Sequence, residues 1–205
     1  MDFVFHPAVL EYFPNYDYRS PRGQREVICD MRNPGNMVGH QQRAFSVWWA
    51  LKCCSPLDLG LDIGSHRGLT PYCIHVDKFG DGKTHPFYGG SYVADVVASG
   101  EAMESVFPRN AFPFINSNHS IEHIPGDTVS ILKSWLSLLR PGGILAMVVP
   151  DNAHFDVLAS DADHKHAWTA AEFRDRVLSG LAEAEILEYD TLKNNFSFNA
   201  VLRRI

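Results

Sequence analysis

Leu-Asp-Leu-Gly-Leu-Asp-Ile-Gly-Ser-His-Arg-Gly, residues 57–68, is the stretch that decides the fold. Its short apolar run at 59–63 ends in a glycine-bearing turn that begins at Gly64. This pattern is typical of a buried parallel strand that ends in a ligand-binding loop. Asp77 follows at the end of the next short apolar run. A glycine turn after one strand and an acid after the next can hold a ribose, while the alternative is an ordinary turn with a surface aspartate.

Composition limits the classes of protein that this chain can belong to. Its 205 residues, 45% hydrophobic and 20% charged, predict one globular domain with a full core. The net charge of −6 disfavours a nucleic-acid partner, and no apolar run is long enough for a membrane span. The first residues do not have the pattern of a signal peptide. The four cysteines do not have C-x-x-C spacing, so we expect them to be reduced thiols and the protein to be cytoplasmic. They are Cys29, Cys53, Cys54 and Cys73.

The first 54 residues are predicted to form a cap on a core that spans 57–205. A helix is expected at 37–53, and Ser55-Pro56 ends it. The cap either packs on the domain or forms a lid over the ligand. Four residues are the expected lid contacts: Tyr16, Tyr18, His40 and Arg43.

The core alternates strands and helices. Strands are expected at 58–63, 73–76, 92–97, 112–116 and 144–149. Helices are expected at 126–140, which Asp127-Thr128 opens, and at 170–180, where Thr169 and Glu172 form a capping box; polar loop 153–168 lies between them. Two last strands, 183–192 and 196–203, predict an antiparallel hairpin. The fold class is therefore α/β: a compact, Rossmann-like, doubly wound sheet, mostly parallel with an antiparallel C-terminal hairpin strand.

Three segments farther along resemble a known family. Asn-His-Ser-Ile-Glu-His-Ile at 118–124 holds an H-x-x-E-H pattern, Arg-Pro-Gly-Gly stands at 140–143, and Val-Val-Pro-Asp at 148–151. Together they resemble a class I S-adenosylmethionine-dependent methyltransferase of the small-molecule, type 11-like kind, over about 57–203. The resemblance implies S-adenosyl-L-methionine as the cofactor.

The resemblance also implies a set of cofactor-binding positions. The first motif would cradle the methionine part, Asp77 would hold the ribose hydroxyls, the segment 99–101 would lie beside the adenine, and 116–119 would lie under the methyl donor. His66 replaces a usual glycine, Ser99 a usual aspartate, and Pro113 a common aspartate. The implied cofactor-binding residues are Asp62, Gly64, Ser65, His66, Gly68, Asp77, Ser99, Gly100, Glu101, Asn116, Ser117, Asn118 and His119.

S-adenosylmethionine and a nicotinamide dinucleotide need different things from the protein. A dinucleotide places its pyrophosphate on a helix N-terminus. The connection from Gly68 to Cys73 contains Pro71 and leaves no room for a normal helix. S-adenosylmethionine has no phosphate and needs no such helix, so a nicotinamide oxidoreductase is disfavoured.

Histidines supply the candidates for catalysis. His119, just beyond the fourth expected strand, is the first candidate for a general base, and the alternative is a polar residue that only shapes the pocket. Glu122 and His123 are interpreted as structural. In the loop 153–168, His154, His164 and His166 are candidate substrate contacts or bases. That loop's histidines and aspartates could also bind a metal, but their spacing fits no template, and no metal is expected.

The sequence thus predicts a methyltransferase acting on an O or N nucleophile of a small molecule, such as a metabolite, a sugar or a lipid-linked intermediate. The alternative is a non-catalytic protein of the same fold that binds a nucleoside ligand or a protein partner. The oligomeric state is left open.

Overall fold

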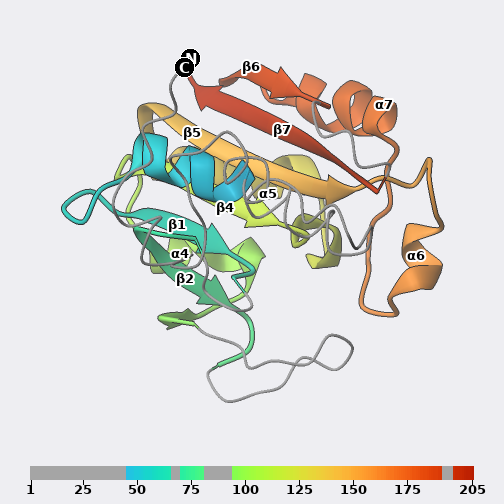
Figure 1. Ribbon diagram of the computed structural model, residues 1–205, viewed down its shortest axis with the longest axis horizontal. Helices are drawn as coiled ribbons and strands as arrows, with labels where there is room; N and C mark the ends of the chain where they lie inside the picture. Colours follow the sequence, from blue (N-terminus) through green and yellow to red (C-terminus); the bar gives the residue numbers. More distant parts are fainter. Residues whose placement is uncertain (1–44, 66–69, 81–93, 191–195) are drawn as a thin grey trace, which may run out of the picture.

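The computed structural model describes residues 45–65, 70–80, 94–190 and 196–205, which are coloured in Figure 1. The four expected lid contacts (Tyr16, Tyr18, His40 and Arg43) lie outside the described residues. The division into a cap and a core therefore stays a prediction. Of the expected helix 37–53, the described part, 45–53, is helical.

A seven-stranded sheet organises the described chain, in the order β3-β2-β1-β4-β5-β7-β6. Neighbours among β1 to β5 pair in parallel, whereas β7 pairs antiparallel with both β5 and β6. The chain winds outward from β1 to β3 and then returns to continue on the other side of β1. The predicted α/β, doubly wound fold with an antiparallel C-terminal hairpin is confirmed. The strands are β1 Gly60–Ile63, β2 Cys73–Asp77, β3 Val96–Val97, β4 Phe112–Asn118, β5 Leu139–Pro150, β6 Ala184–Tyr189 and β7 Ser197–Arg204.

The connection between β1 and β2 is short, as the sequence predicted. In its described residues, 64–65 and 70–72, no helix forms. Two strand predictions need correction. The third strand, expected at 92–97, is reduced to Val96–Val97 in the described residues. The fifth strand, expected at 144–149, begins earlier, at Leu139, so that Arg-Pro-Gly-Gly at 140–143 lies within β5. The pairing of β4 with β5 shifts register around Pro113, which has no N–H to donate.

Apart from the helical segment 45–53 and α5, the described helices are short. At the start of α5, the side chain of Asp127 accepts a hydrogen bond from the backbone N–H of Ser130. The predicted capping box of Thr169 and Glu172 is also present. The expected single helix at 170–180 is instead a succession of α, π and 3-10 turns, and the expected loop 153–168 contains a helical turn. The helical elements are η1 Gly100–Ala102, α4 Met103–Val106, η2 Ile121–His123, α5 Thr128–Leu138, α6 Val157–Ser160, α7 Ala170–Glu172, η3 Phe173–Val177 and η4 Leu178–Gly180.

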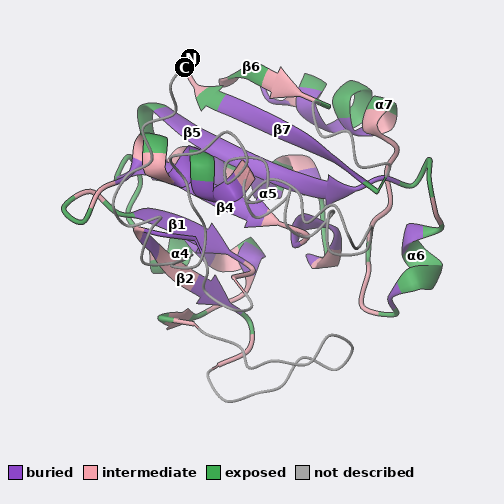
Figure 2. Cartoon of the chain, in the orientation of Figure 1, coloured by how far each residue is buried: buried purple, intermediate pink, exposed green. Residues whose placement is uncertain are grey.

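The two faces of the sheet pack against different layers, because successive side chains of a strand point to opposite faces. On one face, Ile115 joins a large core with side chains of α5 and of the turns that follow α7. On the other, Phe114 packs against Trp49 of the helical segment 45–53. Figure 2 shows the result, with the central strands coloured as buried and exposed positions on β6, α6 and α7. Among the described residues, none of the helices has the length and apolar character that crossing a membrane requires.

Candidate functional site

A cavity of about 810 Å³ lies at the carboxyl ends of the parallel strands. This is the edge at which open α/β sheets bind ligands, where the strand order reverses between β1 and β4. Its volume is within the range of small-molecule sites, roughly 300–1,000 Å³. The walls come from the residues that follow β1, β2, β3, β4 and β5, and from Phe196 before β7.

The predicted cofactor positions divide into three groups. Those that line the cavity are Gly64, Asp77, Ser99, Gly100, Glu101, Asn118 and His119. Those that the structure describes but does not place in the lining are Asp62, Ser65, Asn116 and Ser117. His66 and Gly68 lie outside the described residues.

Gly64 brings the turn after β1 against the turn after β4. Its φ of +75° is in the left-handed region that favours glycine. A Cβ at this position would lie 1.5 Å from Oγ of Ser120, and that hydroxyl donates a hydrogen bond to the carbonyl of Ile63 at 3.0 Å. The glycine is therefore required by contact between two parts of the protein, before any ligand is considered.

Asp77 lies at the carboxyl end of β2, where it is 6% exposed and lines the cavity. Its Oδ1 accepts a hydrogen bond from the backbone N–H of Phe79 at 3.0 Å. This bond fixes the carboxylate at the sheet edge. The ring of Phe79 lines the same cavity and provides an apolar surface beside the acid.

The next wall is the segment 99–101, which α5 holds from behind. Nε1 of Trp135 donates a hydrogen bond to the carbonyl of Gly100 at 2.8 Å, and a Cβ on Gly100 would lie 2.3 Å from Cδ1 of Ile124. Oγ of Ser99 donates to the carboxylate of Glu101. The segment is thus fixed by its contacts within the protein, and two polar side chains face the cavity.

Asp62 belongs to a buried network and not to the cavity wall. Its Oδ1 accepts from the side-chain amide of Asn116 at 2.7 Å, and its Oδ2 lies 3.3 Å from Nδ1 of His75. The same amide of Asn116 lies 3.4 Å from the hydroxyl of Thr70. These contacts join β1, β2 and β4 to one another, so Asp62 and Asn116 support the site from within the sheet.

His119 is the predicted catalytic residue that lines the cavity. It has a φ of +51°, a left-handed conformation in which histidine is over-represented. Its Nε2 lies 2.8 Å from Oγ of Ser197, and its ring stacks on Phe196 at 5.7 Å between centroids. Burial, followed by the nearby His123 and His164, lowers the pKa of His119 to about 3, so the ring is uncharged at neutral pH.

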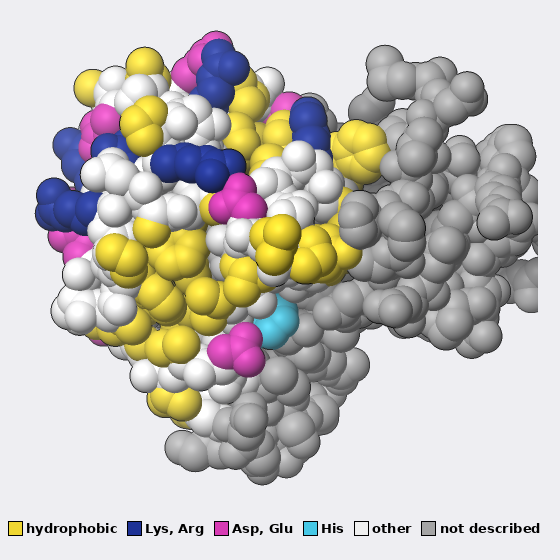
Figure 3. Space-filling view, turned by 90° about the vertical axis from the view of Figure 1, so that its left-hand side faces the viewer, with side chains coloured by type: hydrophobic (Ala, Val, Ile, Leu, Met, Phe, Trp, Pro, Cys, Tyr) yellow, Lys and Arg dark blue, Asp and Glu magenta, His cyan; other side chains and the backbone are white. Residues whose placement is uncertain are grey.

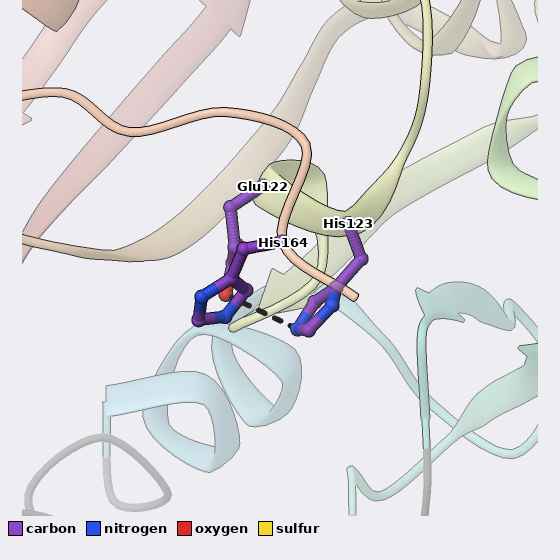
Figure 4. A group of neighbouring side chains, drawn as sticks. All are labelled: Glu122, His123 and His164. Carbon is purple, nitrogen blue, oxygen red and sulfur yellow. Dashed lines mark ion pairs between the residues drawn. The ribbon is translucent and has the colours of Figure 1, made fainter. Parts of the chain in front are cut away.

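Glu122, His123 and His164 form a polar cluster in the cavity (Figure 4). Nε2 of His123 lies 3.8 Å from Oε1 of Glu122, and the rings of His123 and His164 are 4.4 Å apart between centroids. Burial raises the pKa of Glu122 to about 8 and lowers that of His123 to about 4. The sequence interpretation took Glu122 and His123 as structural, and the structure places both residues in the cavity lining. Their position in η2, shortly after the carboxyl end of the parallel strand β4, was the available signal.

The two other predicted catalytic histidines lie outside the cavity lining. His154 has a side chain that is 44% exposed, with Nε2 3.8 Å from Asp151. Nε2 of His166 lies 3.0 Å from the carbonyl of Ile124, and its ring stacks on Trp168. His166 therefore ties its loop to the segment after β4, and neither histidine faces the cavity.

Comparison with known proteins agrees with this architecture. No protein-family model matches the sequence, and no curated protein sequence matches it. Among solved structures, the chain is similar to geranyl diphosphate C-methyltransferase from Streptomyces coelicolor, whose structure holds S-adenosyl-L-homocysteine. The TM-score is 0.57, with 12% identity over 92% of this chain and 83% of that one. It is also similar to an S-adenosylmethionine-dependent methyltransferase from Archaeoglobus fulgidus, with a TM-score of 0.56 and 15% identity over 84% and 95% of the two chains.

A third similar structure is a chain of the complex between the Trm112 methyltransferase activator and a methyltransferase of Haloferax volcanii. The TM-score is 0.55, with 14% identity over 87% of this chain and 96% of that one. At such identities the likeness concerns the fold. The fold is that of the S-adenosylmethionine-dependent methyltransferases, which confirms the resemblance seen in the sequence.

Proposed function

We propose that this protein is a methyltransferase that uses S-adenosylmethionine and transfers the methyl group to an O or N nucleophile of a small molecule. One observation carries the proposal: in a methyltransferase fold, the cavity at the sheet edge brings together Asp77, the Gly64 turn and the segment 99–101. These are the places where a ribose, a methionine part and an adenine would lie side by side.

The residues present suit such a cofactor. The carboxylate of Asp77 has the oxygens to accept from two ribose hydroxyls, and Phe79, Ala98 and Ile124 supply apolar surface for a flat base. No phosphate-binding helix N-terminus is needed, and none is formed in the described residues between β1 and β2. When bound, S-adenosylmethionine supplies a methyl group on a sulfonium sulfur. The nucleophile takes the methyl group and gives up a proton, and the rest of the cofactor leaves as a neutral thioether.

The protein's own contribution is to position the nucleophile and to exclude water. His119 lies at the end of β4, beside Asn118, where both face the cavity. We place the acceptor next to His119, whose backbone is held by a hydrogen bond from its N–H to Val148 at 2.9 Å. Phe155 and Phe196 stack 4.6 Å apart on this side and give the acceptor an apolar wall.

A small acceptor is supported by the size of the cavity and by the charge of the surface. In the view of Figure 3, the Lys and Arg side chains of the described residues are scattered among Asp, Glu and uncharged side chains and do not form one continuous basic surface. Together with the net charge of −6, this disfavours a nucleic-acid substrate.

Isothermal titration calorimetry with S-adenosylmethionine and S-adenosylhomocysteine tests the proposal. We expect both to bind the wild-type protein, and Asp77→Ala to weaken binding at least tenfold, because hydrogen bonds to a charged group contribute about 1.5–3 kcal/mol each. Asp175→Ala, an exposed acid on η3, is the matched control. No binding at millimolar ligand would refute the methyltransferase proposal, and equal binding by Asp77→Ala would refute the ribose assignment. Cofactor binding without methylation of any compound in a broad acceptor panel would favour a non-catalytic role.

A further inference from the structure

Glu122 has a buried carboxylate to which the described residues donate no hydrogen bond. Its side chain is fully buried, and neither oxygen has a hydrogen-bond partner among the described residues. The nearest imidazole nitrogens, Nδ1 of His119 and Nε2 of His123, lie 3.7 and 3.8 Å from Oε1, beyond hydrogen-bond distance. Protonation alone does not solve the problem, because it would leave a buried O–H without an acceptor. Buried acids of this kind are found paired or bound to a metal.

Two histidines complete a set of metal-binding donors. One donor atom from each of Glu122, His123 and His164 can be chosen so that all three lie within 4.8 Å of one another. Figure 4 shows that Glu122 and His123 come from η2, whereas His164 reaches them from the loop that follows α6. Two imidazoles and one carboxylate are a donor set that divalent transition metals use, including Zn²⁺.

His164 is oriented as metal-binding histidines are. Its Nδ1 lies 2.6 Å from the carbonyl of Val157, which can only accept, so Nδ1 carries the proton and Nε2 keeps a free lone pair. A hydrogen bond from the second ring nitrogen to a carbonyl or carboxylate is the usual support of a metal-binding imidazole. His123 has no such hydrogen bond: its Nδ1 lies 3.7 Å from Oδ2 of Asp163, beyond hydrogen-bond distance, and its Nε2 lies toward Glu122.

The backbone holds the two segments together without a metal. The backbone N–H groups of Lys165 and His166 donate to the carbonyl of Glu122 at 2.8 and 3.1 Å. His164 is therefore fixed beside Glu122 by hydrogen bonds that do not involve the donor side chains. To bind a common ion at about 2.0–2.2 Å from each donor, the donor atoms must move closer together than the 4.8 Å that now bounds their separations.

We propose that Glu122, His123 and His164 bind one divalent transition-metal ion, with Zn²⁺ the best match, in the wall of the cavity. Three protein ligands leave a coordination position open, as in catalytic zinc sites. Because all three residues line the cavity, that position faces the space in which we place the acceptor. The site would take an oxygen or nitrogen donor of that molecule, and the metal binding itself does not depend on the proposed methyl transfer.

Metal binding tests this proposal without any assay of activity. Protein stripped with a chelator is loaded with Zn²⁺, passed through gel filtration and measured by elemental mass spectrometry, and Zn²⁺ affinity is measured by calorimetry. We expect one Zn²⁺ per chain. Glu122→Gln and His164→Gln should each weaken binding at least ~100-fold, since each removes a direct ligand, a greater loss than the 10–100-fold of a second-shell change. His154→Gln, an exposed histidine outside the cluster, should bind as the wild type does.

Two further measurements make the outcome decisive. Co²⁺ substitution should give the visible absorption of a site with imidazole and carboxylate ligands, and His164→Gln should abolish it while circular dichroism shows the fold intact. Absence of retained Zn²⁺, or equal affinity in wild type and His164→Gln, would overturn the proposal. Titration of S-adenosylhomocysteine into the metal-free protein separates the two proposals, because cofactor binding there would persist if only the metal site is wrong.

Discussion

The side-chain amide of Asn116 donates a hydrogen bond of 2.7 Å to Oδ1 of Asp62, and both residues are almost completely buried. They stand opposite each other in register on β4 and β1, the two strands between which the sheet reverses its winding. The other oxygen of Asp62 faces His75 on β2. One carboxylate thus connects three neighbouring strands directly beneath the cavity.

Removing the amide should destabilise the protein while leaving the cavity wall in place. We expect Asn116→Ala to lower the free energy of unfolding by about 1.5–3 kcal/mol, because a buried charged acceptor loses its donor. Urea unfolding followed by circular dichroism measures this. Asn152→Ala, which removes the acceptor of a part-buried hydrogen bond from the backbone N–H of Val157, should cost less than Asn116→Ala. A cost below about 0.5 kcal/mol for Asn116→Ala, the size of an ordinary surface substitution, would contradict the network.

Gly64 offers a second test, in which backbone strain and close contact can be separated. Gly64→Ala adds a methyl group where Oγ of Ser120 already lies 1.5 Å away, and it places alanine at a φ of +75°. The left-handed conformation alone costs about 1–2 kcal/mol. We expect a total of at least ~3 kcal/mol, because Ser120 must also move and lose its hydrogen bond to Ile63.

Gly142→Ala is the matched control for this substitution. Gly142 has a φ of +79°, and a Cβ there would meet nothing within 4 Å. Its cost should therefore be that of the conformation alone, about 1–2 kcal/mol. Equal losses of unfolding free energy for the two variants would show that the contact between Gly64 and Ser120 contributes nothing.

The sequence predicted the fold well because the fold depends on local patterns. Apolar runs gave β1, β2, β4 and β5, and capping residues such as Asp127 and Thr169 marked helix starts. One of the details that the sequence predicted wrongly, the length of the third strand, depends on contacts with residues distant in the chain. The third strand has only Val96 and Val97 paired in the described residues, because its length depends on the neighbour β2 and not on its own β-branched residues.

The candidate site was predicted less completely, for a physical reason. Residues directly after strands, such as Asp77 and His119, were found because the carboxyl ends of parallel strands share one edge of the sheet. Asp62 lies one residue before the strand end and points to a face of the sheet, which alternation along the strand decides. His164 is one of several histidines in one polar loop, and the sequence does not distinguish it from the others. The tertiary hydrogen bonds of that loop are what place His164 in the candidate site.

The capping box at the start of α7 gives a prediction with a defined pH dependence. Oγ1 of Thr169 accepts from the backbone N–H of Glu172 at 3.2 Å, and the carboxylate of Glu172 accepts from the backbone N–H of Thr169 at 3.0 Å. The backbone N–H of Thr169, then its hydroxyl, lowers the pKa of Glu172 below its usual value. Thr169→Ala should lower the unfolding free energy by about 1 kcal/mol, the usual cost of losing an N-cap.

Glu172→Gln isolates the charge, because glutamine can still complete a capping box. Since the pKa of Glu172 is lower in the folded than in the unfolded state, its carboxylate stabilises the fold fully above the unfolded value of roughly 4.3. The contribution is lost as the pH falls through the folded pKa. The wild type should therefore be more stable than Glu172→Gln at pH 7, and urea unfolding should show the two converging as the pH falls below about 4. A stability difference that stays constant from neutral to acidic pH would rule out a role for the charge and leave the cap to Thr169 alone.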